Sequence, residues 1–352
     1  MKKITEFFNK FYISNPPWEY NFLQDLDESD YPKYLAKLFY LKTGEKLPLF
    51  KEWNFKRYKG AVPSGKKLWN YIIDKNKCKT FNQKIQYIKL YGITNLMRDC
   101  TDKVKVRDYV REHIGAEYLK PALQIVRNEK LEVRSDNSIS NSSLLTPNLF
   151  DKIDFEKLPD SFVIKCNHGC KWHYIIKNKE EYLKNKRLVE ITRRNITGWL
   201  EQDYSLWGGF EMQYKGIKPK ILIEPLLRED IDNDVEKLQL YCFNGIPKYI
   251  FRFYGNNTET VHNEHFQFVD KIFICKEQKI DIEVNENVKI AAKLSKELSK
   301  NFNFVRVDWM IFKNKLYFEE LTFTPYSGMH KFTQKSYDEK FGSFINIERE
   351  HK

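Results

Sequence analysis

The most informative segment of the chain is 304–322, which reads FVRVDWMIFKNKLYFEELT. Two stretches rich in β-branched and aromatic residues flank the short polar turn KNK, and this pattern predicts a β-hairpin. Side chains alternate along a strand, so Val307 and Trp309 are expected on one face, with Arg306 and Asp308 on the other.

On the returning strand, Glu320 and Thr322 are expected to point together, and Glu319 is expected to point away from them. The hairpin therefore brings one arginine and two carboxylates close together, namely Arg306, Asp308 and Glu320. Carboxylate oxygens suit Mg²⁺, and a neighbouring arginine suits a phosphate oxygen. The same residues are equally compatible with an ion-pair ladder on a sheet surface, and the hairpin alone does not distinguish the two.

Other segments show the periodicities of further strands and helices. Strands are expected at 161–165, 219–225, 238–243 and 247–253, and Asn244-Gly245 between the last two is a strong hairpin signal. Helices are expected at 81–91, 102–114 and 286–300. The sequence therefore predicts an α+β protein with antiparallel strands and two lobes.

Two of these helices have recognisable ends or faces. The helix 102–114 is expected to begin with Thr101 as its N-cap and to stop at Gly115. The helix 81–91 is expected to bury one apolar face formed by Phe81, Ile85 and Ile88, with Tyr91 as a further candidate at its end.

Several polar residues lie at the ends of predicted elements. Lys103 is in the first turn of its helix, and Lys165 ends a strand just before a turn that contains His168 and Gly169. A lysine beside a glycine-containing loop can meet nucleotide phosphates, with loop amides as further donors. Glu224 ends a strongly apolar strand, and a buried carboxylate there needs a partner, such as an adenine or ribose edge.

The composition limits the location and the partners. Sixty Lys and Arg against 48 Asp and Glu give a net charge of +12, which is compatible with anionic partners such as nucleotides, acidic sugars or phospholipid surfaces. We expect no nucleic-acid partner. No apolar run approaches the roughly 18 residues of a membrane span. Asn9 and Lys10 interrupt the N-terminal apolar stretch, which argues against a secretory signal peptide. Six cysteines are too few for a disulfide scaffold in a chain of this length. We expect a cytoplasmic protein whose basic segment 171–200 can touch the inner membrane face.

Five segments, in this order, resemble the TupA-like branch of the ATP-grasp superfamily. They are TFNQKIQYIKLYG, TDKVKVRDYVREHIG, FVIKCNHG, CFNGIPKYI and FVRVDWMIFKNKLYFEELTFTPYSGM. The resemblance covers about 45–345 and implies an ATP-grasp fold, in which two α+β lobes with antiparallel sheets clasp ATP and Mg²⁺. TupA is associated with teichuronopeptide, a cell-wall polysaccharide decorated with amino acids.

The resemblance implies roles for individual side chains on the nucleotide side. Lys103 and Lys165 match the two lysines that contact the nucleotide, beside the phosphate loop that contains His168 and Gly169. Glu224 matches the hinge carboxylate near adenine.

It also implies roles for the hairpin. Arg306 matches the catalytic arginine that steadies phosphate, and Asp308 and Glu320 match the magnesium carboxylates. Thr322 stands where many ATP-grasp enzymes have a metal-binding asparagine, and its hydroxyl is expected to take that place.

The resemblance implies a ligase that phosphorylates a carboxylate and joins it to an amine. The substrates are expected to be an amino acid or amine and a uronic-acid-type carboxylate of a surface polysaccharide precursor. The expected organisation is a mostly helical region 1–98, a catalytic region 99–345 with a flexible insertion at about 135–146, and a tail 346–352.

Three alternatives remain open. A glycosyltransferase of capsule or cell-wall polysaccharide synthesis would use Asp230 and Asp232 for a metal-bound sugar nucleotide. An ATP-grasp sugar kinase would transfer phosphate to a hydroxyl group. A degenerate scaffold would bind ATP without turnover.

Overall fold

The computed structural model describes residues 78–127, 148–206, 211–227, 235–254, 258–269, 272–273, 278–279, 281–328 and 330–347. Several predictions from the sequence lie outside the described residues. These are the helical region before residue 78, the insertion 135–146, the pair Asp230 and Asp232, and the last residues of the tail.

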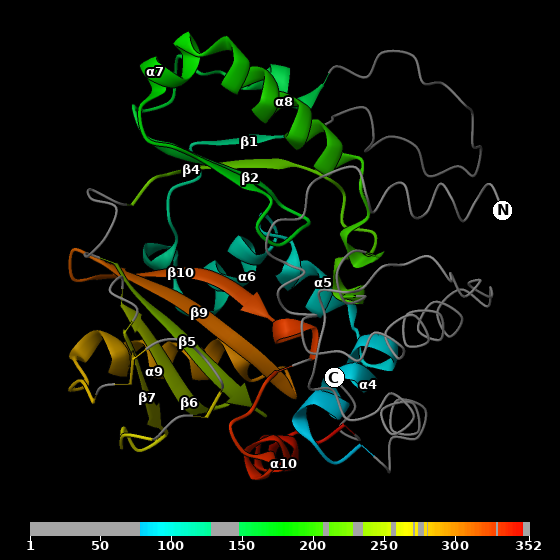
Figure 1. The fold of residues 1–352 in the computed structure, drawn as a ribbon, viewed down its shortest axis with the longest axis vertical. Helices are drawn as coiled ribbons and strands as arrows, with labels where there is room; N and C mark the ends of the chain where they lie inside the picture. Colours follow the sequence, from blue (N-terminus) through cyan, green and yellow to red (C-terminus); the bar gives the residue numbers. More distant parts are fainter. Residues whose placement is uncertain are drawn as a thin grey trace, which may run out of the picture.

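The smaller lobe contains a four-stranded sheet in the order β1-β4-β2-β3, with every pair of neighbours antiparallel. Its strands are β1 (Gln124–Val126), β2 (Phe162–Cys166), β3 (His173–Ile176) and β4 (Ile221–Pro225). Helices α7 (Lys179–Lys184) and α8 (Lys186–Leu200) cover one face of this sheet (Figure 1). Phe162, Ile164, Ile196 and Ile223 form the centre of a separate apolar core there.

The larger lobe contains a six-stranded sheet in the order β10-β9-β5-β6-β7-β8. Its strands are β5 (Val235–Phe243), β6 (Ile246–Tyr254), β7 (Thr258–Asn263), β8 (Gln278–Lys279), β9 (Phe304–Phe312) and β10 (Lys315–Thr322). All neighbours are antiparallel except the short parallel pair β7–β8. The predicted α+β class with antiparallel sheets is confirmed.

Helix α9 (Glu286–Ser299) packs against one face of the larger sheet, as Figure 1 shows. Val288, Ala291 and Leu298 are fully buried, and the indole Nε1 of Trp309 donates to Ser295 Oγ at 2.8 Å. This contact fixes the apolar face of β9 toward α9, so the opposite face of β9 is turned toward the smaller lobe.

The β5–β6 hairpin turns at the predicted dipeptide. Asn244 has φ 50° and Gly245 has φ 81°, so both central residues are left-handed, as a tight hairpin turn requires. Only glycine adopts this conformation without steric cost, which explains the residue at position 245.

Four further helices pack between and below the sheets: α4 (Phe81–Tyr91), α5 (Asn95–Thr101), α6 (Val106–Ile114) and α10 (Lys335–Phe344). Helix α4 starts with a capping box formed by Thr80 and Gln83. Phe81, Ile85 and Ile88 are buried on α4 as predicted, but Tyr91 does not belong to this face, because that residue is half exposed.

The predicted start of the helix after Thr101 is also wrong. Thr101 closes α5, and its hydroxyl donates to the carbonyl of Met97 at 2.7 Å instead of capping a new helix. Asp102 Oδ1 accepts the amide of Val104 at 2.8 Å, and this turn separates α5 from α6. Helix α6 ends at the predicted Gly115. Lys103 therefore lies in a turn between two helices and not in the first turn of one.

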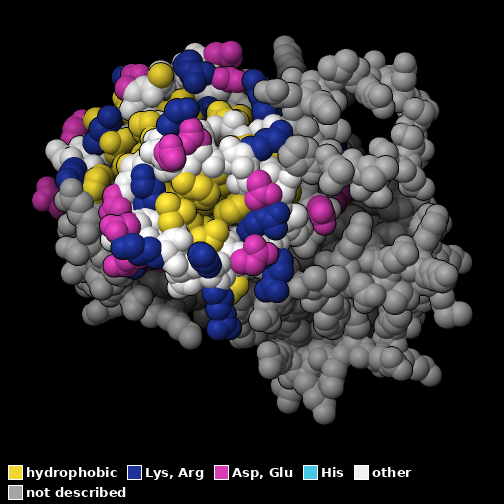
Figure 2. Space-filling view, turned by 90° about the horizontal axis from the view of Figure 1, so that it is seen from above, with side chains coloured by type: hydrophobic (Ala, Val, Ile, Leu, Met, Phe, Trp, Pro, Cys, Tyr) yellow, Lys and Arg dark blue, Asp and Glu magenta, His cyan; other side chains and the backbone are white. Residues whose placement is uncertain are grey.

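Charges of both signs cover the outer face of the smaller lobe. Figure 2 shows Lys and Arg side chains interspersed with Asp and Glu around exposed apolar side chains. Leu183 and Leu188, of α7 and α8, are among the exposed large apolar residues. Among the described residues, no helix combines the length and apolar character needed to cross a bilayer.

Candidate active site

The hairpin β9–β10 brings four of the predicted site residues together on the face opposite α9. Asp308 lies opposite Glu320, and Arg306 lies opposite Thr322, in neighbouring strands. Arg306 donates from Nε and Nη2 to the two oxygens of Asp308, at 2.7 and 2.5 Å. Its Nη2 also lies 3.4 Å from Glu320 Oε1, and the Thr322 hydroxyl donates to Glu320 at 2.9 Å.

A β-bulge changes the direction of the next acidic residue. The register shifts between Phe318 and Glu320, so Glu319 is an extra residue in β10. Instead of pointing away from Glu320, Glu319 forms an ion pair with Lys120, in the segment between α6 and β1. The expectation that Glu319 points to the other face is therefore wrong, because a bulge interrupts the regular alternation of side chains between the two faces of a strand.

Glu224 lies at the end of β4 in a cluster of cations. Its Oε2 lies 2.7 Å from Lys165 Nζ, and its Oε1 lies 3.0 Å from Arg107 Nη1. Burial raises the pKa of the Glu224 carboxyl, but the charges of Lys165, Lys120 and Arg107 together lower it below the ordinary value. Glu224 is thus an ionised carboxylate held in the interior by cations.

Arg107 and Lys120 were not anticipated from the sequence. Arg107 also donates from Nη2 to the carbonyl of Lys120 at 2.6 Å, which ties α6 to the entry of the smaller lobe. Burial and the nearby Lys165 lower the pKa of Lys120 to about 7. A buried carboxylate needs cationic partners, so the position of Glu224 in an apolar strand could have indicated that such partners exist.

The tip of the β2–β3 hairpin is attached to the turn before α6. Lys103 donates its ammonium to the carbonyl of Gly169 at 2.5 Å, and its backbone amide donates to the carbonyl of Asn167 at 3.2 Å. The buried Asn167 amide group donates to Asp102 Oδ1 at 2.9 Å and accepts from the backbone of Lys220 at 2.6 Å. These contacts fix the loop that the sequence analysis identified as a phosphate loop.

His168 points into the smaller lobe and not toward the gap between the sheets. Its Nε2 donates to the carbonyl of Trp199 at 3.1 Å, and only 3% of the residue is exposed. Burial lowers the pKa of His168 to about 4, against the effect of the bond to Trp199. The imidazole is therefore neutral near pH 7, and the backbone of this loop is what remains available to an anion.

Gly169 is required by its neighbour Trp172. A Cβ atom at position 169 would lie 2.3 Å from the Trp172 ring, so one of the two must move. We expect Gly169→Ala to weaken Mg·ATP binding at least tenfold, because the loop amides would be displaced. Calorimetric titration with Mg·ATP measures this effect. The control is Gly198→Ala on α8, where nothing lies within 4 Å of the added Cβ. Binding by Gly169→Ala as tight as that of Gly198→Ala would contradict the assignment of the loop.

A second strained segment follows the strand that carries Thr322. Tyr326 and Ser327 both have φ 51°, a left-handed conformation that is unfavourable for residues with a side chain. The fully buried Lys89 of α4 donates to the carbonyl of Ser327 at 2.8 Å, and Gln86 donates to the same carbonyl at 2.9 Å. Helix α4 thus holds the backbone that continues from β10.

Lys165 of the smaller lobe and Lys103, in the turn between α5 and α6, act electrostatically on a carboxylate of the larger sheet. Burial opposes ionisation of Glu320, but the charges of Arg306, Lys103 and Lys165 outweigh it and lower the pKa. Burial raises the pKa of Asp308 to about 7, although Arg306 counteracts this shift. Lys103 and Lys165 therefore share one electrostatic site with Arg306, Asp308 and Glu320.

The donor set of this site fits one hydrated magnesium ion shared with a phosphate ligand. Within the described residues, no three His, Cys, Asp or Glu side chains form a complete metal-binding cluster. Mg²⁺ is usually held by only one or two carboxylates, together with substrate phosphates and water. Asp308 and Glu320 could supply the carboxylates, and the Thr322 hydroxyl could supply a further oxygen.

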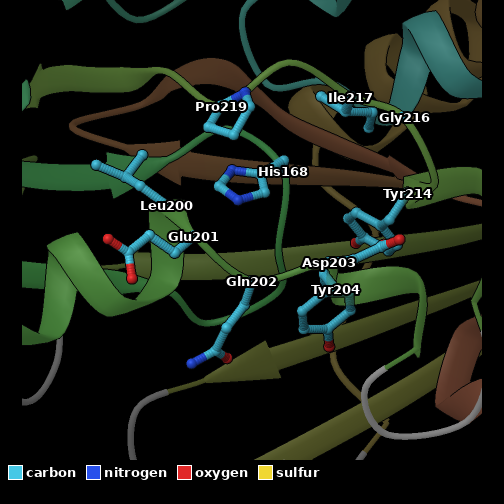
Figure 3. A pocket seen from close by; sticks show the side chains of 10 residues that line it. All are labelled: His168, Leu200, Glu201, Gln202, Asp203, Tyr204, Tyr214, Gly216, Ile217 and Pro219. Carbon is cyan, nitrogen blue, oxygen red and sulfur yellow. The ribbon is translucent and has the colours of Figure 1, made fainter. Parts of the chain in front are cut away.

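A cavity of about 230 Å³ lies beside the β2–β3 tip. It is lined by His168, by residues 200–204 after α8, and by residues between 214 and 219 that lead into β4 (Figure 3).

The chain matches one protein-family model. Residues 137–346 match the model of the TupA-like ATP-grasp proteins. This region contains eight of the nine predicted site residues, and only Lys103 precedes it. Among curated proteins, no sequence matches the chain significantly.

Solved structures show weaker similarity. D-alanine–D-alanine ligase of Helicobacter pylori is 12% identical with a TM-score of 0.37, over 76% of this chain and 69% of the ligase. Phosphoribosylamine–glycine ligase of Thermotoga maritima is 12% identical with a TM-score of 0.34, over 83% of this chain and 66% of that chain. D-alanine–D-alanine ligase of Bacillus anthracis in complex with ATP is 17% identical with a TM-score of 0.31, over 69% and 62%. The last two matches span less than two thirds of the matched proteins, and similarities this low do not bear on activity.

Proposed function

The chain belongs to the TupA-like ATP-grasp family, and from this membership we propose that it is a carboxylate–amine ligase that uses Mg·ATP. ATP and Mg²⁺ are the cofactors of ATP-grasp proteins. The observation that carries the proposal is the cluster on one face of the β9–β10 hairpin, where Arg306 bonds both oxygens of Asp308 and lies 3.4 Å from Glu320, which accepts from the Thr322 hydroxyl.

In this proposal the two sides of the site have separate tasks. Asp308, Glu320 and Thr322 hold the magnesium ion, and Arg306 contacts the phosphoryl group that is transferred. When bound, the metal supplies positive charge that stabilises the transferred phosphoryl group. Lys103 and the loop at Gly169 orient the phosphates from the opposite side.

The nucleotide end of the site contains the cluster around Glu224. We propose that Lys165 bridges between this carboxylate and the phosphates, and that Glu224 accepts hydrogen bonds from the ribose or adenine edge. Arg107 and Lys120 keep Glu224 ionised, so it acts as an acceptor only.

The proposed reaction has two steps. An oxygen of the carboxylate substrate attacks the γ-phosphorus, and ADP leaves with the electron pair of the broken P–O bond. The amine nitrogen then attacks the carbonyl carbon of the acyl phosphate, which forms the amide and releases phosphate and a proton. We further propose that the carboxylate belongs to a uronic acid of a surface polysaccharide precursor.

We also propose the organisation and the location of the protein. A helical region 1–98 precedes a catalytic region 99–345, and a short tail follows. The protein acts in the cytoplasm, where the basic segment 171–200 contacts an anionic acceptor or the inner membrane face.

Trapping with hydroxylamine tests the proposed reaction. With UDP-glucuronic acid as the carboxylate probe, Mg·ATP and hydroxylamine, we expect ADP release together with a hydroxamate, because hydroxylamine intercepts an acyl phosphate. A stable phosphorylated sugar without hydroxamate would instead establish a sugar kinase. UDP release without ADP would favour a glycosyltransferase that uses Asp230 and Asp232. ATP binding without any product from a panel of uronic acids would favour a scaffold without turnover.

A further inference from the structure

On the hairpin face, Arg306 is held by groups that the proposed function assigns to magnesium. It donates to both oxygens of Asp308, at 2.7 and 2.5 Å. Its Nη2 also lies 3.4 Å from Glu320 Oε1 and 3.2 Å from the hydroxyl oxygen of Thr322. All three partners are proposed metal ligands, so only a different partner can hold Arg306 independently of the metal.

Tyr241 of β5 is such a partner. It lies directly opposite Arg306 of β9 in the antiparallel register, so the two side chains are neighbours on one face of the sheet. Burial raises the pKa of the Tyr241 phenol, and the charge of Arg306 and a side-chain hydrogen bond to it oppose that shift. The Tyr241 side chain is fully buried and packs against the rings of Phe81 and Phe304, which fixes the position of its hydroxyl group.

His330 determines the direction in which this hydroxyl group bonds. The Tyr241 oxygen and His330 Nε2 lie 3.1 Å apart. A guanidinium group only donates, so the Tyr241 oxygen accepts from Arg306 and its own proton is left for His330 Nε2. This arrangement needs a neutral imidazole with its proton on Nδ1. Burial lowers the pKa of His330 well below its ordinary value, and the charge of Arg306 lowers it further, so the ring is neutral near pH 7.

The backbone and the ring of His330 are both fixed by other elements. Asn82 of α4 donates from Nδ2 to the carbonyl of His330 at 2.9 Å and accepts the amide of His330 at 2.8 Å. The imidazole stacks on Phe273, with the ring centroids 4.2 Å apart and the planes 13° from parallel. A continuous chain of polar contacts therefore runs from α4 through His330 and Tyr241 to Arg306.

We propose that Tyr241 and His330 are positioning residues for Arg306. His330 Nε2 accepts the phenol proton, and this bond turns a lone pair of the Tyr241 oxygen toward the guanidinium. The guanidinium then keeps the orientation in which it meets the phosphoryl group to be transferred. This inference rests on the proposed ligase function and deepens it, because it assigns a role in the site to two buried residues that need not touch the nucleotide.

Mg·ATP and Mg·ADP differ only in the γ-phosphate, so calorimetric titration of the full-length protein with each tests the effect on that group. Tyr241→Phe keeps the ring and removes the hydroxyl. We expect it to weaken Mg·ATP binding about tenfold, as loss of a hydrogen bond to a charged group predicts, and to leave Mg·ADP binding within about twofold.

Tyr109→Phe is the matched control. It removes another buried phenol group, which donates to the carbonyl of Leu298 at 3.0 Å, far from the hairpin in sequence. Both nucleotide affinities should be unchanged in this variant. If Tyr241→Phe weakens Mg·ATP and Mg·ADP equally, or weakens neither, the positioning role is wrong, since a purely structural loss does not select the γ-phosphate.

Two variants of His330 test the acceptor. His330→Gln places an amide oxygen close to the position of Nε2, so it should keep the affinity for Mg·ATP within about threefold of the unmodified protein, because the hydrogen bond is retained. His330→Phe keeps an aromatic ring beside Phe273 but has no acceptor, and it should lose the same affinity as Tyr241→Phe. If His330→Phe does not fold, the comparison of His330→Gln with Tyr241→Phe decides. A loss in His330→Gln as large as that in Tyr241→Phe would contradict the proposal.

The tautomer of His330 provides a readout that needs no nucleotide. In protein labelled with 15N-histidine, NMR should show a protonated Nδ1 and an unprotonated Nε2 for this ring, identified by the absence of its signals in His330→Gln. The Nε2 signal should shift in Tyr241→Phe, because its donor is gone. A proton on Nε2, or an Nε2 signal that does not respond to Tyr241→Phe, would exclude the proposed direction of the bond.

The same titrations separate this inference from the ligase proposal. If the unmodified protein binds Mg·ATP and Tyr241→Phe binds it equally well, the ligase proposal stands and the positioning role fails. If the unmodified protein binds neither Mg·ATP nor Mg·ADP, the ligase proposal fails, and the positioning role fails with it even where the tautomer is the expected one.

Discussion

Asp308→Asn is expected to abolish magnesium-dependent ATP binding. Asparagine has nearly the same volume as aspartate but offers one neutral oxygen where magnesium prefers a charged one. Residues outside the coordination sphere of a metal already contribute about 10–100-fold, so loss of a direct ligand should lower nucleotide-dependent turnover at least about 100-fold. Calorimetric titration with ATP, with and without Mg²⁺, measures the binding.

Loss of the fold must be separated from loss of the metal ligand. Asp308 makes two hydrogen bonds to the buried Arg306, so its replacement also removes an ion-pair partner. The thermal midpoint therefore has to be measured beside the titration. Asp99→Asn, at an exposed residue that pairs with Lys105 on the surface, is the control and should leave both quantities unchanged. A folded Asp308→Asn protein that binds Mg·ATP normally would show that the metal site lies elsewhere.

Glu224→Gln is expected to cause the largest loss of stability. The carboxylate is nearly inaccessible and contacts both Lys165 and Arg107. Breaking a buried ion pair by removing one partner typically costs about 3–5 kcal/mol, because the other charge stays buried. Urea unfolding of the unmodified and variant proteins measures the difference in free energy of unfolding.

An exposed ion pair provides the control for Glu224→Gln, and the pH dependence of stability provides a second test. Glu180→Gln breaks the exposed pair with Lys184 and should change stability by less than about 1 kcal/mol. The folded pKa of Glu224 is below its ordinary value of 4.5, so its contribution is present above pH 4.5 and is lost as the pH falls through the folded pKa. The Glu224→Gln protein should lack this part of the acid transition. A loss of stability no larger than that of Glu180→Gln would mean that the cations are not held by Glu224.

Local patterns were sufficient for most of the strands and helices. Alternation in 304–312 predicted both faces of β9 correctly, since one face packs on α9 and the other carries the Arg306–Asp308 pair. The dipeptide Asn244-Gly245 marked a turn that has two left-handed residues. These features depend on neighbours in the chain, which a sequence displays directly.

Local sequence patterns gave wrong predictions at two positions, Thr101 and Glu319. Thr101 is a good N-cap by composition, but its hydroxyl bonds back to Met97 and ends a helix. By strict alternation along β10, Glu319 would lie on the face opposite Glu320. A bulge in β10 instead lets it pair with Lys120. The bulge belongs to the pairing of β10 with β9, and the break after Thr101 is stabilised by Asp102, which accepts from Val104 and from Asn167 of the β2–β3 hairpin.

The sequence by itself determined the elements, the α+β class and the identity of the polar residues on β9 and β10, because alternation and turn chemistry act over a few residues. The tertiary structure alone decided which charges meet. Glu224 pairs with Lys165 and Arg107 across 59 and 117 positions of the chain, and the cavity beside the β2–β3 tip brings His168 together with residues that follow α8. Such contacts form between surfaces that come together only when the two sheets pack, and their energy depends on burial that no local segment of sequence specifies.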